Sequence, residues 1–382
     1  PTESHEIPAP AEYAESPDYK KTGRVIRKQK IALRTFVDVV ELYTPEYRNI
    51  KTGQRVHAPF PEGFVNDVNY DGSVKAFTFL LGNESNVSHE KIQKFLAELT
   101  DGEIIISKGM INGLCREFSL KTEAERKEVR AALMSSPVMN TDFTNANVNG
   151  ESAQVLICAE PETELVIFNA RKKKGHEGIQ GTLVEGYQGI MVHDHDSTFY
   201  KYGQKHQECM QHNIRYLKGS IENEPNLKWN TQMLELIREM LHYRNGLGEA
   251  GLDAEIVSEM GKRYDKILEL AEGEYLDDPP SEYYREGYNL YLRLKKYKES
   301  ELLFLHDKRV PPDNSLSERM ARVYKRKQKQ AIVMRSFQGF EDLCTSMGMV
   351  RLMRQKEGSS YKMISNIFER KSPPKKKGTP AD

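Results

Sequence analysis

Apolar residues in the middle of the chain fall into short runs with β-strand spacing. PVMNTDFTNANV (137–148), SAQVLICAE (152–160) and TELVIFNARK (163–172) predict three strands joined by tight turns. HEGIQGTLVEGY (176–187) then predicts a helix, and GIMVHDH (189–195) a fourth strand. This order is typical of an α/β fold with an RNase H-like mixed sheet, in which the first and fourth strands are neighbours.

From residue 205 onward the spacing becomes helical. KHQECMQHNIRYLKGSI (205–221) predicts a helix that carries Cys209, His212 and Tyr216 on one face. Residues 226–305 hold long, acidic, amphipathic segments and no strand pattern. We therefore predict an all-helical insertion, after which LSERMARVYKRKQKQ (316–330) supplies the helix that closes the sheet domain.

The part of the chain before the sheet has a different pattern. The first residues are rich in Pro, Glu, Ser and Tyr, and IALRTFVDVVELYT (31–44) has β-strand character. Three short helices follow around tight turns and resemble a helix-turn-helix, whose third helix would point Lys108, Asn112 and Arg116 outward toward DNA. Short helix pairs are common and mostly structural, so a purely structural role stays open.

These patterns predict seven segments. They are a flexible leader (1–24), a small β region (25–66), a helical and candidate DNA-binding region (67–130), the first part of the catalytic core (131–212), the helical insertion (213–305), the closing helix of the core (306–345), and a C-terminal helix with a basic tail (346–382).

Composition narrows the class of protein. Lys and Arg number 56, as do Asp and Glu, so the net charge is zero, but basic residues concentrate in 319–335 and in the tail KSPPKKKG (371–378). No run is long and apolar enough to span a membrane, and the hydrophilic start cannot act as a secretory signal, so we expect a cytoplasmic protein. The four cysteines form no CxxC pair and are expected to be free thiols. A start at Pro1 rather than Met fits a trimmed chain or a fragment.

Three carboxylates indicate a metal site. Asp142 and Asp194 each follow a short apolar run and precede polar residues, as acids at strand ends do, and Glu318 begins the closing helix. Phosphoryl transfer with two divalent cations needs such a carboxylate cage, and Mg²⁺, with Mn²⁺ as substitute, prefers oxygen ligands. We expect Asp142 to bridge both ions, with Asp194 and Glu318 on one each. Asp196 competes with Asp194, and a single strand-end Asp is more often a turn or cap residue.

The helix after Glu318 is almost wholly basic. Arg322 and Lys325 lie four and seven residues beyond Glu318, which places them on its helical face, where they could hold a DNA phosphate. The DNA-binding candidates on this helix are Arg319, Arg322, Lys325, Arg326, Lys327 and Lys329. The alternative is a solvated basic face paired with the acidic insertion.

Cys209 and His212 are one helical turn apart and, with His193, His195 and His206 nearby in sequence, raise the possibility of a zinc site. No second well-spaced pair accompanies them. A core or supporting role beside the acids is therefore the preferred interpretation.

Several blocks resemble the insertion-sequence family 66 transposases. They are GIMVHDHDSTFYKY (189–202), HQECMQHNIRYLK (206–218), LLFLHDKRVPPDNSLSERMARVYKRKQ (302–328) and RSFQGFEDLCTSMGMVRL (335–352), within a resemblance that covers roughly 25–368. DNSLSER, with Asn314 and Glu318, is the most specific block, and Cys209, His212 and Arg215 match a C-x-x-H-x-x-R block. The family's cysteine-rich zinc region has no counterpart in these residues, and Met210, Gln211 and Asn213 depart from the usual block.

The resemblance implies an RNase H-like DDE transposase with Asp142, Asp194 and Glu318 as its three acids. It also implies Mg²⁺-dependent DNA cleavage and strand transfer, DNA element ends and a target as partners, and a homodimer or higher oligomer when two ends are paired. Two other readings stay open. One is an RNase H-like nuclease without strand transfer, and the other is a domesticated or inactive transposase that binds DNA without catalysis.

Overall fold

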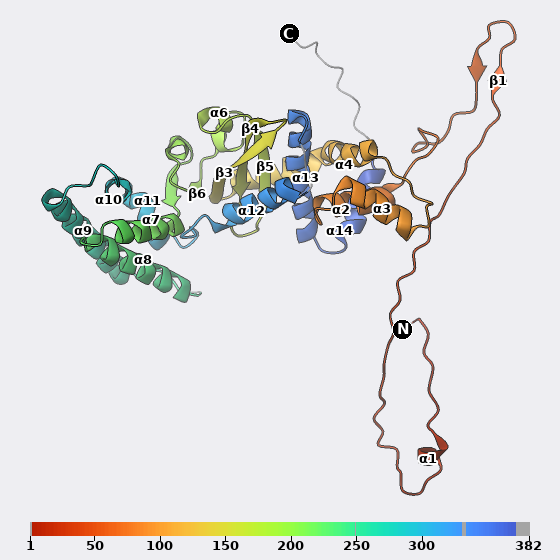
Figure 1. The fold of residues 1–382 in the computed structure, drawn as a ribbon, viewed down its shortest axis with the longest axis horizontal. Coiled ribbons are helices and arrows are strands. Elements are labelled where there is room, and N and C mark those ends of the chain that lie inside the picture. Colours follow the sequence, from red (N-terminus) through yellow and green to blue (C-terminus); the bar gives the residue numbers. More distant parts are fainter. Residues whose placement is uncertain (1, 249, 331–333, 372–382) are drawn as a thin grey trace.

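The computed structural model describes residues 2–248, 250–330 and 334–371 and is built around one mixed sheet (Figure 1). Within the described residues this sheet has five strands in the order β5-β4-β3-β6-β7. Their bounds are β3 Val138–Val148, β4 Glu151–Ala159, β5 Val166–Arg171, β6 Ile190–His193 and β7 Lys205–Glu208. The mixed α/β class expected from the sequence is therefore confirmed.

The sheet combines an antiparallel half with a parallel half. β3, β4 and β5 form an antiparallel meander, and β3 also pairs in parallel with β6, as does β6 with β7. Asn149 and Gly150 join β3 to β4 with φ values of 53° and 86°, which a two-residue type I′ turn requires. The first and fourth strands of the sheet are thus neighbours, as the strand order predicted.

Two layers of helices cover the antiparallel half of the sheet. One face packs against α12 (Ser315–Gln330) and α13 (Phe337–Gln355), whose buried Tyr324 and Phe340 meet the strands. The other face packs against helices from both ends of the chain, with Phe79, Phe118 and Phe368 at their centre. Those helices are α2 (Gly72–Asn83), α4 (Lys108–Lys121), α5 (Glu123–Ser135) and α14 (Ser360–Glu369), while α3 (His89–Leu99) packs on α2 and α4.

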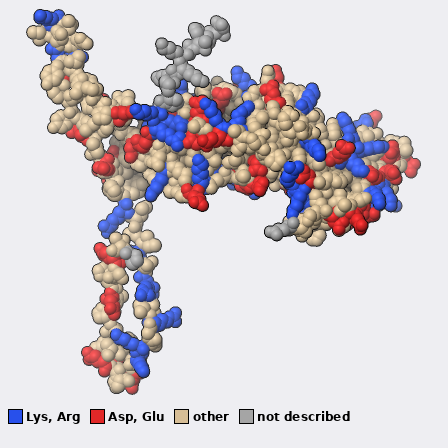
Figure 2. All heavy atoms as spheres, turned by 180° about the vertical axis from the view of Figure 1, so that it is seen from behind, with Lys and Arg blue, Asp and Glu red and all other residues tan. Residues whose placement is uncertain are grey.

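A helical block extends from the β6–β7 side of the sheet, at the left of Figure 1. It comprises α7 (Met210–Asn223), α8 (Trp229–Gly246), α9 (Ala254–Asp277), α10 (Glu286–Lys296), α11 (Lys298–Leu302) and the 3₁₀ turn η3 (Leu303–Leu305). Trp229 is fully buried at its centre, and Val138, Ile190 and Val192 of the sheet belong to the same core. Figure 2 shows basic and acidic side chains interspersed over this end of the molecule.

The small β region expected over 25–66 is reduced to a hairpin of two-residue strands, β1 (Tyr47–Arg48) and β2 (Arg55–Val56). Its apolar side chains, such as Ile31 and Phe36, are about 90% exposed, so they have no core on which to build a larger sheet. Together with the four-residue helix α1 (Ala11–Ala14), this part of the chain reaches away from the folded body (Figure 1).

Two expected helices were wrong in extent. The helix expected over 176–187 is a short α6 (His176–Ile179) and a 3₁₀ turn η1 (Val184–Gly186), separated where Gly181 adopts a φ of 77°. The helix expected over 205–221 begins only at Met210, because 205–208 pair with β6 as β7. The basic tail beyond Lys371 lies outside the described residues. Among the described helices, none combines the length and hydrophobicity that crossing a membrane requires.

Candidate active site

The register of the sheet brings Asp142 and Asp194 together. Asn140 and Val192 are the last residues that β3 and β6 pair with each other. Asp142 lies two residues after Asn140, and Asp194 lies two residues after Val192. Asp194 directly follows β6, as expected, whereas Asp142 lies within β3, which continues to Val148 along β4. Both are partly buried and stand where the pairing of β3 with β6 ends.

Glu318 reaches the same place from the first turn of α12. Asn314, just before that helix, is fully buried, and its side-chain amide donates to the Thr141 carbonyl at 2.8 Å. The Asn140 amide in turn donates to the Asp313 carbonyl at 3.4 Å. These bonds fix the start of α12 against the two residues that precede Asp142, which places Glu318 beside it.

The three carboxylates are called the acidic triad below, and Asp142 is affected by the charges of the other two. Burial, followed by the charges of Asp194 and Glu318, raises the pKa of Asp142 to about 7. The backbone hydrogen bond from Phe143 and the charge of Lys174 lower this pKa, but they offset only part of the increase. The triad therefore concentrates negative charge on hard oxygen donors, and this donor set fits a divalent cation such as Mg²⁺.

Cys209 and His212 are next to Glu318. The Cys209 thiol lies 3.9 Å from Glu318 Oε1, and His212 Nδ1 lies 3.7 Å from the same oxygen. The Cys209 amide donates to the His193 carbonyl at 3.0 Å, which ties the start of α7 to the end of β6. Burial raises the pKa of Cys209 to about 12, so it is a thiol at neutral pH.

Arg215 and Asn314 complete the supporting positions proposed from the sequence. Burial, followed by the charge of the exposed Arg215, lowers the pKa of His212. The backbone N–H of Asn314 donates to Cys209 Sγ at 3.3 Å, and its side-chain amide donates to the Thr141 carbonyl. Asn314 therefore contacts both β3 and the start of α7. The structure thus groups Asp142, Asp194, Glu318, Cys209, His212, Arg215 and Asn314 in one region.

Asp196, the competitor of Asp194, has a structural role. Its carboxylate accepts from the Thr198 amide at 3.0 Å and caps the 3₁₀ turn η2 (Ser197–Lys201). Burial raises the pKa of Asp196, but hydrogen bonds from Thr198 and the nearby Lys174 ammonium outweigh it and lower the pKa below its usual value. Lys174 lies 3.2 Å away, so the charge of Asp196 already has a partner.

A second acidic group nearby was missed in the sequence. Glu208, at the end of β7, is fully buried and accepts a two-pronged hydrogen bond from Arg293 of α10, with Nε to Oε2 at 2.6 Å. Tyr200 donates to it at 2.6 Å, and His195 Nε2 lies 3.3 Å from it. Glu301 is also fully buried, and burial followed by the Glu208 charge raises its pKa well above the usual range. We call Glu208, Glu301, Arg293 and His195 the buried ion-pair cluster.

No short motif announces that cluster. Glu208 is adjacent in sequence to Cys209, but Arg293 and Glu301 come from the helical block, 85 and 93 residues beyond Glu208. Only the fold brings them together. The one available signal was the position of Glu208 directly before the C-x-x-H block.

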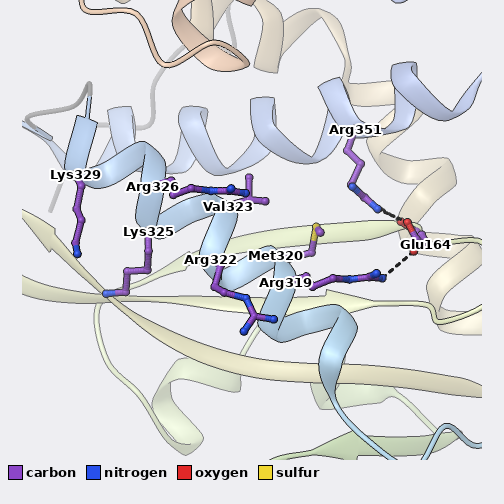
Figure 3. A pocket seen from close by; sticks show the side chains of 9 residues that line it. All are labelled: Glu164, Arg319, Met320, Arg322, Val323, Lys325, Arg326, Lys329 and Arg351. Carbon is purple, nitrogen blue, oxygen red and sulfur yellow. Dashed lines mark hydrogen bonds and ion pairs between the residues drawn. The ribbon is translucent and has the colours of Figure 1, made fainter.

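The basic face of α12 lines an open hollow of about 540 Å³ (Figure 3). Arg319, Arg322, Arg326 and Lys329 are exposed and Lys325 is partly buried. Arg319 and Arg351 both contact Glu164 from the β4–β5 turn, with Arg319 Nη2 at 2.8 Å from Oε1 (Figure 3). Arg322 is also 3.9 Å from Glu318, so the hollow adjoins the acidic triad.

Lys327 corrects the sequence prediction for this helix. It is only 3% exposed, and its ammonium donates to the Gly82 carbonyl of α2. Burial lowers its pKa to about 8. Lys327 faces the interior because it lies about 140° around α12 from Arg322, so it does not belong to the exposed basic face. On α4, Lys108, Asn112 and Arg116 are exposed, as predicted.

Comparison with known proteins gives one family. No curated protein matches the chain. The profile described as "Transposase IS66 family" matches residues 80–342, which is more than half of the chain and includes β3, β6, β7 and α12 with all three acids of the triad. The chain therefore belongs to the IS66 family of transposases.

Proposed function

We propose that this transposase cuts and joins DNA at an active site made of Asp142, Asp194 and Glu318. The observation that carries the proposal is the convergence of three acids, separated by 52 and 124 residues in sequence, at one edge of one sheet. Burial, followed by the charges of Asp194 and Glu318, raises the pKa of Asp142 to about 7, so the ionised triad lowers stability unless a cation neutralises it.

We further propose that the sheet is RNase H-like and that the helical block is an insertion within it. The support is the strand order, an antiparallel meander whose first strand pairs in parallel with the next strand along the chain. The block of α7 to α11 separates β7 from α12 in sequence, and α12 then returns to pack on β3 and β4.

Asp142, Asp194 and Glu318 would hold Mg²⁺ or Mn²⁺, because carboxylates are the ligands those ions prefer. When bound, such ions activate the attacking oxygen and stabilise the leaving oxygen in phosphoryl transfer. The residues of the protein position these carboxylates. Asn314 fixes the start of α12, so that Glu318 is held in place before substrate arrives.

The basic face of α12 would hold the DNA backbone beside the acids. Arg322 lies one turn from Glu318 and is 65% exposed, so its guanidinium can contact a phosphate next to the reacting one. Arg326 and Lys329 extend the positive surface along the helix (Figure 3).

Hydrolysis at an element end would expose a 3′-hydroxyl, and attack of that hydroxyl on target DNA would complete strand transfer. Two paired ends need two copies of the site, hence a dimer or a higher oligomer.

The proposal is tested by nicking and joining of a supercoiled plasmid that carries element ends, in Mg²⁺ or Mn²⁺. Glu318→Gln should abolish nicking, while Asp196→Asn should keep most of it, because Asp196 is a cap with its own lysine partner. Circular dichroism of both variants checks the fold. Wild-type activity in Glu318→Gln would refute the triad, and nicking without joined products would favour a nuclease without strand transfer.

A further inference from the structure

Cys209, His212 and Glu318 offer three metal-ligating atoms from two elements. Cys209 precedes α7, His212 lies one turn into that helix, and Glu318 comes from the first turn of α12. Their candidate ligand atoms all lie within 4.8 Å of one another. Glu318 is the third ligand that no sequence spacing could reveal, since it is 106 residues beyond His212.

The separations are close to those around a tetrahedral ion. Bonds of about 2.3 Å to sulfur and about 2.0–2.1 Å to nitrogen or oxygen give ligand–ligand edges of roughly 3.3–3.6 Å. Here Glu318 Oε1 lies 3.9 Å from Cys209 Sγ and 3.7 Å from His212 Nδ1. The third separation, between the Cys209 and His212 ligand atoms, is within 4.8 Å, so side-chain shifts of at most about 1 Å would complete three vertices of a tetrahedron.

The local structure holds these atoms ready. Cys209 is fixed by its own backbone bond to His193 and by the Asn314 amide that donates to its sulfur. His212 Nδ1 is buried and makes no hydrogen bond within the described residues. A buried ring nitrogen without a hydrogen bond is costly, so a ligand for it would be favourable.

We propose that Cys209, His212 and Glu318 bind a thiophilic divalent cation of the zinc class, at a site separate from that of Mg²⁺. Thiolate and imidazole ligands select such ions over Mg²⁺, which prefers oxygen. On binding, the Cys209 thiol gives its proton to solvent, and the fourth position stays open to water. This metal-binding proposal rests on the geometry of the three side chains and does not depend on the proposed function.

The regulatory consequence does rest on the proposed function. Both sites would use Glu318, whose Oε1 faces Cys209 and His212. A zinc-class ion held there would compete with Mg²⁺ for this carboxylate and inhibit Mg²⁺-dependent cleavage. The start of α12 would then act as a switch between two metal sites that share one carboxylate.

Cobalt(II) provides a direct test on the full chain after removal of metals with a chelator. We expect one equivalent to give a sulfur-to-cobalt charge-transfer band and the intense visible bands of four-coordinate cobalt, which zinc then bleaches. Cys209→Ser should abolish the charge-transfer band and weaken binding at least about 100-fold, more than loss of an outer hydrogen-bond partner would. His212→Gln and Glu318→Gln should each weaken binding at least about tenfold.

The controls separate this inference from the proposed function. Cys115→Ser removes a half-buried thiol outside the site and should leave the spectrum unchanged. Asp142→Asn removes a member of the triad but not of the thiol-containing site, and should keep the charge-transfer band even if cleavage is lost. Absence of the band in the wild type, or its persistence in Cys209→Ser, would overturn the proposal whether or not the triad cleaves DNA.

Discussion

Two acidic groups lie at the same end of the sheet, and the pKa values of one carboxylate in each, Asp142 and Glu208, are shifted in opposite directions. Among the described residues the acidic triad has three carboxylates and no cation that neutralises it fully, and the pKa of its Asp142 is raised to about 7. In the buried ion-pair cluster, burial alone would raise the pKa of Glu208, but Arg293, together with His195 and a hydrogen bond with Glu301, outweighs it and lowers the pKa below its usual value. Asp194 of the triad directly follows β6, and Glu208 of the cluster is the last residue of the parallel neighbouring strand β7.

On the proposed function, this difference separates a group that stabilises the fold from one that would carry out chemistry. Arg293 satisfies Glu208 with two hydrogen bonds, so the buried ion-pair cluster joins the helical block to the sheet. In the triad the carboxylates still repel one another, which lowers stability and so would not be retained for stability alone. Substitutions at the two groups should therefore have effects of opposite sign on stability, and only those at the triad should change chemistry while preserving the fold.

The largest expected effect is on catalysis. Asp142→Asn should lower the rate of plasmid nicking at least about 1,000-fold, which corresponds to about 4 kcal/mol, because it removes the acid that interacts electrostatically with both other members of the triad. Single-turnover cleavage in Mg²⁺ measures it. A rate within tenfold of the wild type would remove Asp142 from the site.

The next effect is the loss of stability in the buried ion-pair cluster. Arg293→Met leaves Glu208 buried and unpaired, so the free energy of unfolding should fall by about 3–5 kcal/mol. Urea denaturation followed by circular dichroism measures the change. Arg263→Met is the matched control, since the Arg263–Glu239 pair is also two-pronged, through Nη1 and Nη2, but its side chains are 40% and 49% exposed and it should contribute less than about 1 kcal/mol. Equal losses in both variants would contradict the comparison.

A third effect is the pH dependence of stability without divalent metal. Folding raises the pKa of Asp142 from its ordinary value of 3.8 to about 7, so the folded state keeps a proton that the unfolded chain has released. The wild type should therefore lose stability relative to Asp142→Asn as pH rises from about 4 to 7, by about 1–3 kcal/mol at pH 8. Thermal melts at pH 5 and pH 8 measure this, and Mg²⁺ should return stability to the wild type alone. A pH-independent difference would contradict the interpretation.

The smallest effect concerns the basic hollow beside the triad. Glu164 holds Arg319 and Arg351, so Glu164→Gln should release both for DNA and raise affinity about two- to fivefold, with a salt dependence steeper by about one unit. Fluorescence anisotropy with a short duplex at several salt concentrations measures both quantities. Glu162→Gln removes the same charge from an exposed neighbouring position and is the control. A similar gain in DNA affinity in that variant would mean that the change in net charge, and not the release of the two arginines, explains the effect.

The sequence was informative where a local pattern decides the structure. Alternating apolar residues located β3 to β6, and the parallel neighbours β3 and β6 followed from the strand order. It was uninformative where distant segments decide it. The four residues of β7 have too little pattern to be separated from the helix that follows, and the exposed apolar residues around Phe36 suggested a sheet for which no partner layer exists within the described residues.

The candidate site shows the same division. Asp142, Asp194 and Glu318 could be proposed from strand ends and a helix start, although Asp142 proved to lie inside a strand. Helical spacing could not show that Lys327 faces α2, because a run of basic residues hides which side of the helix is buried. Nor could it show that Cys209 and His212 meet Glu318, since that contact depends on the closed fold.

The bond from Asn314 to the Thr141 carbonyl spans 173 residues of sequence, and it bears on how the protein is made. At typical rates of about 5–20 residues per second, a ribosome needs roughly 10–35 s after adding Asp142 before it adds Glu318. Throughout that interval the emerging chain carries two of its three acids and lacks the helix that brings the third. On the proposed assignment, a chain that ends before Glu318, or that has not yet been extended to it, lacks the third acid, so the ability to cut DNA is acquired only after Glu318 and its helix have been added.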